Sequence, residues 1–190
     1  MPPVMRVLAI SGSLRAASIN SALLRAATRL ARPEMEVRIF GARDELPLFN
    51  PDLEAQLPRA AAALREAVGA ADALLIASPE YAHGVSGVIK NALDWLVGCE
   101  DFAGKRVAVI NASARAAHAD AALRETLKTM AAEIVEEASV TIAIPGASFP
   151  EEAMLRCAPI AAAIGRSLDA LYEALMAARA AAVQPAAPLP

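Results

Sequence analysis

Short apolar runs alternate with longer segments whose apolar residues recur at helical spacing. The apolar runs have the length of buried strands, and they cover residues 4–10, 35–40, 72–78, 105–113 and 138–144. The helical segments are rich in alanine and leucine, and they cover residues 19–31, 56–69, 86–98, 119–132 and 151–179. Five alternations of strand and helix predict an α/β fold with a parallel sheet covered by helices on both faces.

The winding of this sheet determines where a ligand would bind. Because crossovers are right-handed, the simplest order for five strands is 2-1-3-4-5. Ligands of such doubly wound sheets bind beyond the carboxyl ends of the strands, near the point where the order reverses. Three polar loops meet this condition: the first loop (residues 11–18), the second loop (78–86) and the third loop (111–118). We expect a single domain over residues 1–179 and a low-complexity, disordered tail over 180–190.

The composition excludes several classes of protein. The 190 residues carry a net charge of -3, whereas a nucleic-acid-binding surface needs a basic face. No run reaches the ~20 uncharged apolar residues of a membrane span, and the first residues lack the layout of a signal peptide. The two cysteines, Cys99 and Cys157, form no metal or disulfide pattern. We therefore expect a cytoplasmic protein with no nucleic acid, membrane or metal partner.

The first loop has the composition of an anion site. It contains three serines, Gly12 and Arg15, whose planar guanidinium suits phosphate oxygens. A helix beginning near Ile19 would direct its free N–H groups and its positive dipole end into the loop. The alternative is an ordinary turn in which Ser18 is the N-cap and Arg15 is solvated. A Walker A sequence and a G-x-G-x-x-G fingerprint are both absent, so a single phosphate fits better than a triphosphate or a dinucleotide.

The second loop reads "SPEYAHGVS" and suits a flat heterocycle. Pro79 sets a rigid turn, Gly84 leaves bare backbone, and Tyr81 would form a wall. We interpret Glu80 as a source of backbone contacts or a structural ion pair, with Lys90 or an arginine as partner, rather than as a general acid or base. We interpret His83 in the same way, as a residue that shapes the backbone.

The remaining candidates lie beside these loops. Trp95 falls off the apolar stripe of the helix over 86–98, and we interpret it as an oligomer contact rather than as core. In the third loop, Asn111, Ser113 and the backbone near Ala114 would close over the far side of a ring, and His118 stands where an N-cap is expected. A nucleophilic hydrolase is disfavoured, because no G-x-S-x-G elbow and no cysteine lies between a strand and a helix.

Two segments together resemble the NADPH-dependent FMN reductase family. They are "SGSLRAASIN" (11–20) and "SPEYAHGVSGVIKNALDWL" (78–96), supported by "LPLFNPDLE" (46–54), and the likeness extends from about residue 5 to residue 175. The resemblance implies a flavodoxin-like sandwich, FMN as cofactor, NADPH or NADH as electron donor, and small-molecule acceptors. It also implies a homodimer or homotetramer, with the helices over 86–98 and 119–132 in contact.

The resemblance assigns roles to individual residues. It implies that the FMN phosphate is held by Ser13, Arg15, Ser18, Ile19 and Asn20. It implies that the isoalloxazine edge is followed by Pro79, Glu80, Tyr81, Ala82, His83 and Gly84, and that Ser113 touches the flavin. No catalytic side chain is implied, since the flavin carries the chemistry. Many members have asparagine in place of Ala82 and proline in place of Ser86, and we expect Ser86 to cap the helix instead.

The implied activity is a two-step hydride exchange. NAD(P)H would reduce the flavin, and quinones, azo or nitro compounds, free flavin or metal oxyanions would then accept the electrons. The alternative is a flavodoxin-like electron-transfer protein or a regulatory FMN-binding protein without NAD(P)H turnover. The mild acidity of the chain disfavours a flavodoxin, whereas the acceptor and the preference between NADPH and NADH stay open.

Overall fold

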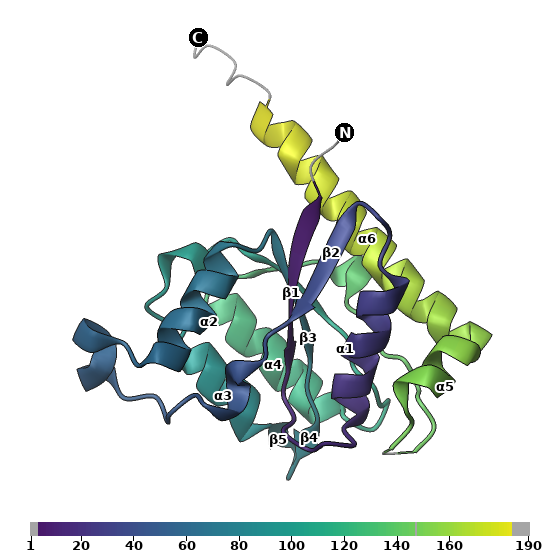
Figure 1. Ribbon diagram of the computed structural model, residues 1–190, viewed down its shortest axis with the longest axis horizontal. Coiled ribbons are helices and arrows are strands. Elements are labelled where there is room, and N and C mark those ends of the chain that lie inside the picture. Colours follow the sequence, from purple (N-terminus) through teal and green to yellow (C-terminus); the bar gives the residue numbers. More distant parts are fainter. Residues whose placement is uncertain (1–3, 147, 184–190) are drawn as a thin grey trace.

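A five-stranded parallel sheet forms the centre of the protein (Figure 1). The computed structural model describes residues 4–146 and 148–183. In hydrogen-bonded order the strands are β2 (Met35–Ile39), β1 (Met5–Ser11), β3 (Ala73–Ala77), β6 (Arg106–Val109) and β7 (Glu133–Ile134). All four pairings are parallel. The predicted order 2-1-3-4-5 is confirmed, because β4 (Glu80–Tyr81) and β5 (Gly84–Val85) form a separate antiparallel hairpin.

Helices cover both faces of this sheet, as the alternating pattern predicts. One face packs against α1 (Ile19–Leu30), α5 (Glu151–Arg156) and α6 (Ala158–Val183), and the other against α2 (Arg59–Gly69), α3 (Gly87–Asp94) and α4 (Ala117–Thr129). Successive side chains of a strand point to opposite faces, so Val7 and Ala9 join the first core while Leu8 and Ile10 join the second. Burial on both faces explains why β3 is apolar throughout and why β1 is apolar from Val7 to Ile10.

The fifth strand lies earlier in the chain than predicted. We expected it over 138–144, but β7 is Glu133–Ile134, and a 3₁₀ turn at Glu136–Ala138 follows it. The Ser139 hydroxyl accepts the N–H of Val109 at 3.0 Å and donates to Val135 O at 2.8 Å, so a side chain replaces a ladder hydrogen bond. Beyond this interruption Thr141 pairs with Asn111 in a parallel bridge. The predicted segment therefore follows the edge of the sheet only after an irregular start.

The C-terminal helical segment is broken near its beginning. We expected one helix over 151–179, whereas α5 ends at Arg156 and α6 begins at Ala158. Pro159 explains the break, because it lacks the N–H that a continuous helix would use and its ring crowds the preceding turn. Helix α6 continues to Val183, past the domain boundary that we placed at residue 179. The rest of the predicted disordered tail, 184–190, lies outside the described residues.

The interpretation of Trp95 as an oligomer contact is wrong. Its side chain is fully buried, and its indole N–H donates to Pro47 O at 2.8 Å. The Phe49 ring meets the indole edge to face, with ring centroids 5.1 Å apart. Asn91 adds two hydrogen bonds to the same segment, one from Phe49 N and one to Pro47 O. Trp95 and Asn91 thus anchor the proline-rich loop that precedes α2.

Candidate functional site

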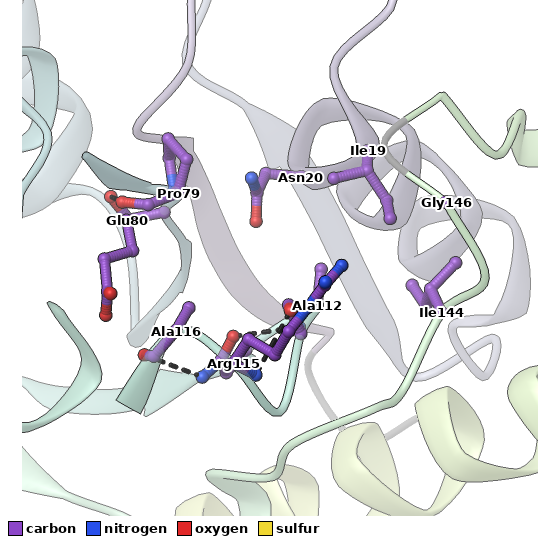
Figure 2. A pocket seen from close by; sticks show the side chains of 12 residues that line it. Ile19, Asn20, Pro79, Glu80, Ala112, Arg115, Ala116, Ile144 and Gly146 are labelled. Atoms are coloured by element: carbon purple, nitrogen blue, oxygen red, sulfur yellow. Dashed lines mark hydrogen bonds between the residues drawn. The ribbon is translucent and has the colours of Figure 1, made fainter. Parts of the chain in front are cut away.

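A cavity of about 270 Å³ opens beyond the carboxyl ends of the strands (Figure 2). It lies between the first turn of α1, which follows the first loop, and the second and third loops, and the end of the segment after β7 closes one side. Its lining residues are Ile19, Asn20, Ser78, Pro79, Glu80, Asn111, Ala112, Ser113, Arg115, Ala116, Ile144 and Gly146. Strands β1 and β3 are neighbours at this point, so the cavity occupies the predicted switch point of the sheet.

The serines of the first loop form a hydrogen-bonded network. The hydroxyls of Ser11 and Ser21 lie 2.8 Å apart, and Ser11 Oγ accepts the N–H of Ser13 at 3.3 Å. Ser13 Oγ in turn accepts the N–H of Arg15 at 3.3 Å. Ser18 is the N-cap of α1, since its hydroxyl accepts the N–H of Ser21. Ser18 therefore caps α1 whether or not it also meets a ligand, and the network holds the loop in one conformation at the start of α1.

Asn20 carries a buried oxygen without a partner. The residue is 4% exposed, and its Oδ1 receives no hydrogen bond from the described residues. Figure 2 shows the side chain directed from α1 into the cavity. An unsatisfied buried acceptor costs roughly 1–3 kcal/mol, which a ligand with an N–H or O–H group would remove. No acidic residue occupies the first turn of α1, so its dipole also favours an anion here.

Arg15 lies at the outer side of the first loop. It is exposed, and its Nη2 donates to Ser148 Oγ at 2.9 Å. This hydrogen bond joins the first loop to the segment that carries Ile144 and Gly146 along the cavity. Within residues 4–146 and 148–183, no carboxylate lies in ion-pair distance of its guanidinium.

The second loop is a strained, exposed hairpin. Ala82 and His83 form the turn between β4 and β5, and both have positive φ, +50° and +59°. Two-residue turns of this kind favour glycine or asparagine, because other side chains in the left-handed region cost roughly 1 kcal/mol or more. Tyr81, Ala82 and His83 are all exposed. Only Pro79 and Glu80 of this loop join Ser78 in the cavity lining.

Glu80 braces the hairpin against α4. Its Oε2 accepts the N–H of Ala119 at 2.8 Å, so the carboxylate caps the N-terminus of α4. The expected ion pair with Lys90 is wrong, because Lys90 pairs with Asp94 on its own helix. His118 is not the N-cap either: it lies inside α4, and its ring stacks on His83 with centroids 4.4 Å apart. Two contacts therefore join the hairpin to α4.

Ser86 fastens the second loop to the first. As predicted, it is the N-cap of α3, accepting the N–H of Ile89 at 3.3 Å. The same hydroxyl donates to Gly12 O at 2.6 Å. The two loops approach so closely that a Cβ atom on Gly12 would collide with Ser78 Oγ and lie 2.9 Å from Ser86 Oγ. Glycine is required at position 12 for this reason.

The third loop is braced by Asn111. Its Oδ1 accepts the N–H of Ser113 at 3.0 Å, and its Nδ2 donates to Ala116 O at 3.2 Å. This fixed turn carries Ser113 and Arg115 into the cavity lining. The sequence offered a signal for Arg115, since it is the arginine of the third loop as Arg15 is of the first, but we did not select it. Ile144 and Gly146 offered none, because they follow an irregular edge segment.

The structure brings together part of the predicted site. Five of the predicted residues line the cavity: Ile19, Asn20, Pro79, Glu80 and Ser113. Ser13 and Ser18 are buried within the first loop behind it. Arg15, Tyr81, Ala82, His83 and Gly84 lie outside the lining.

Residues 4–146 and 148–183 contain neither a cluster of metal ligands nor a membrane-spanning helix. No three His, Cys, Asp or Glu side chains gather there as metal ligands. None of the helices in that part has both the length and the apolar character needed to cross a membrane. Burial lowers the pKa of Lys105, but this residue precedes β6 at the opposite end of the sheet and has no part in the cavity.

Comparison with known proteins matches the chain to one family. The NADPH-dependent FMN reductase family matches residues 5–146. An NAD(P)H-dependent FMN reductase of Pseudomonas aeruginosa is 43% identical over 129 residues, which cover 65% of this chain and 69% of the relative. A quinone reductase of Escherichia coli is 34% identical over 117 residues, covering 60% of this chain and 62% of the relative.

Solved structures agree with these matches. The flavoenzyme NAD(P)H:(acceptor) oxidoreductase FerB of Paracoccus denitrificans superimposes with a TM-score of 0.70 at 28% identity, over 90% of this chain and 98% of its own. An apo NADH:FMN oxidoreductase has a TM-score of 0.63 at 22% identity, over 89% of this chain and 90% of its own, and supports the fold alone.

Proposed function

The chain belongs to the NADPH-dependent FMN reductase family, and from this membership we propose that it is an FMN-dependent NAD(P)H oxidoreductase. Its substrates would be NADPH or NADH as donor, and quinones, azo or nitro compounds, free flavin or metal oxyanions as acceptors. The observation that carries the proposal is that the first turn of α1 and the second and third loops line a single cavity, into which Asn20 directs an unpartnered oxygen.

The residues present fit FMN. The phosphate would be held by Ser13, Arg15, Ser18, Ile19 and Asn20, where a helix N-terminus and a guanidinium favour an anion. Asn20 would donate to the phosphate through its Nδ2, while its unpartnered Oδ1 would accept from an O–H group of the ligand. The ring would lie along Pro79, Glu80, Tyr81, Ala82, His83 and Gly84, with Ser113 on its other side. Bound FMN would supply the chemistry, a hydride accepted from NAD(P)H and electrons then passed to the acceptor.

The chain itself would contribute binding and orientation. Glu80 is the one carboxylate lining the cavity, and it is already engaged by the N–H of Ala119, so it is poorly suited to proton transfer. The braced third loop offers fixed backbone groups and the Ser113 hydroxyl to a flat ligand. We also propose a homodimer or homotetramer with contacts through α3 and α4, to be checked by light scattering on the purified protein.

The proposal is tested by flavin binding and turnover. Protein titrated with FMN is expected to bind it and to oxidise NADPH or NADH with a quinone as acceptor. Absence of flavin binding would overturn the proposal. Binding without nicotinamide turnover would favour the flavodoxin-like or regulatory alternative. A panel of acceptors with both nicotinamides would then give the substrate class.

The phosphate assignment has its own test in Arg15→Ala. Because Arg15 is exposed and its one hydrogen bond from the guanidinium goes to Ser148, the fold should persist. Loss of a charge-assisted contact to phosphate is expected to weaken FMN binding by about tenfold or more. Fluorescence titration of the apoprotein measures this, and unchanged FMN affinity would contradict the assignment.

A further inference from the structure

Arg43 contacts the first loop from a segment that follows β2. It lies in the 3₁₀ turn Ala42–Asp44, just beyond β2. Its Nε donates to Ser13 O at 3.3 Å, and its Nη1 donates to Phe40 O at 3.2 Å. The guanidinium therefore ties the end of β2 to the backbone of Ser13, whose own side chain holds the next turn of the loop.

The charge of Arg43 is unbalanced. The other half-buried arginines of the described chain, namely Arg32, Arg65, Arg106 and Arg124, all form ion pairs with carboxylates. Arg43 is half-buried too, yet no carboxylate of residues 4–146 and 148–183 pairs with it. Its neighbours Asp44 and Glu45 are exposed and make no such contact. Its guanidinium donates only to the neutral carbonyl oxygens of Ser13 and Phe40, so its positive charge remains free to attract an anion.

The anion is expected at the first loop. Arg15 is also without a carboxylate partner, and the first turn of α1 contains no acidic residue. Two unpaired guanidiniums and the positive end of a helix dipole therefore converge on residues 11–20, which would make this region strongly attractive to a doubly charged phosphate.

From these observations we propose that Arg43 is a positioning residue for the FMN phosphate. It holds the Ser13 backbone in the conformation that the phosphate meets, and it adds a second positive charge behind the loop. This inference rests on the proposed function, because it needs FMN as the ligand. An arginine that only stabilised the contact between β2 and the first loop would make the same two hydrogen bonds. The test must therefore separate phosphate recognition from stability.

The experiment compares FMN with riboflavin, which has the same ring and lacks the phosphate. Apoproteins carrying Arg43→Gln, Arg43→Lys or no substitution are titrated with each ligand by flavin fluorescence. Arg166→Gln is the control, because it removes the same charge from an exposed, unpaired position on α6. Arg43→Gln is expected to weaken FMN binding by about tenfold and riboflavin binding by less than about twofold. Arg166→Gln is expected to change neither.

The outcomes separate this inference from the proposed function. If Arg43→Gln weakens the binding of FMN and riboflavin equally, or changes neither affinity, Arg43 has only a structural role and the inference is overturned. Arg43→Lys keeps the charge and the packing of the stem, so it should fold and lose about threefold in FMN affinity alone. If Arg43→Gln does not fold, the ratio of FMN affinity to riboflavin affinity in Arg43→Lys distinguishes phosphate recognition from a structural role. If the unsubstituted protein binds no flavin, both the inference and the proposed function fall.

Discussion

The first loop, which lies behind the cavity and leads into α1, and the β4–β5 hairpin, which reaches the cavity through Glu80, are built differently. In the first loop, hydroxyls turn inward and bind the backbone, so Ser11, Ser13 and Ser18 are buried. In the hairpin, Tyr81, Ala82 and His83 are exposed, and two of them occupy left-handed backbone conformations. The first loop has an internal network of serine hydrogen bonds in addition to its contacts with other segments. The hairpin is held mainly by its contacts with α4, through the Glu80 carboxylate and the stacking of His83 on His118.

This difference suits two tasks. A rigid, preorganised loop lowers the cost of holding a small anion. An exposed turn with few contacts of its own can tolerate reactants of different shape beside the flavin. We expect substitutions in the first loop to act on cofactor affinity and substitutions at the hairpin tip to act on turnover.

The largest change in stability should come from Gly12→Ala, because Gly12 lies where the first and second loops touch. The added methyl group collides with Ser78 and crowds Ser86, so we expect a loss of about 3 kcal/mol in unfolding free energy. Urea unfolding of the apoprotein measures it. Gly41→Ala is the control, since a Cβ atom there meets nothing within 4 Å. Equal urea midpoints for the two variants would show that the loops can separate without cost.

The two N-cap serines should separate stability from binding. Ser86→Ala removes a cap and a hydrogen bond to Gly12 O, at a cost of about 2 kcal/mol in unfolding free energy. Ser18→Ala removes one cap bond, at a cost of about 1 kcal/mol, but should weaken FMN binding more. Ser86→Ala should therefore lose more stability, and Ser18→Ala more FMN affinity. Unfolding curves and FMN titrations of both variants test this opposite ranking. The comparison fails if Ser86→Ala weakens FMN binding more than Ser18→Ala does.

The smallest effect should be a gain, from Ala82→Asn. Asparagine tolerates the left-handed conformation that Ala82 adopts, so unfolding free energy should rise by about 0.5 kcal/mol. Ala131→Asn is the matched control, because Ala131 is also exposed and has φ +60°. Both variants should be stabilised, and only Ala82→Asn should alter quinone turnover. A change in turnover with the control alone would contradict the role given to the hairpin tip.

Most of the fold could be predicted from the apolar pattern. Four of the five predicted strands correspond to β1, β2, β3 and β6, although β6 is only the first part of the run predicted over 105–113. The central strand β3 is the clearest case, because a strand buried on both faces is a continuous apolar run. The fifth was misplaced because Ser139 bonds to Val109 and Val135, a long-range contact that no local pattern records. Trp95 was misread because helical spacing takes no account of the proline-rich loop that covers it.

The site was predicted less completely than the fold. Loop position and polarity were enough to find Asn20, Pro79 and Ser113 at one edge. They were not enough to show that Glu80 would cap α4 or that His83 would stack on His118, because those contacts depend on how a hairpin folds back on a distant helix. Arg43 was missed for the same reason, since it follows β2 and meets Ser13 only in three dimensions.

The contact among Gly12, Ser78 and Ser86 has a consequence for how this protein can be altered. These positions share one small volume, so their substitutions should not combine additively, and a change at one should be tolerated only with a compensating change at another. Positions 81–83 are exposed and lie outside that volume. A library aimed at new acceptors should therefore randomise residues 81–83 and leave 12, 78 and 86 fixed, so that each new specificity is selected on an intact cofactor anchor.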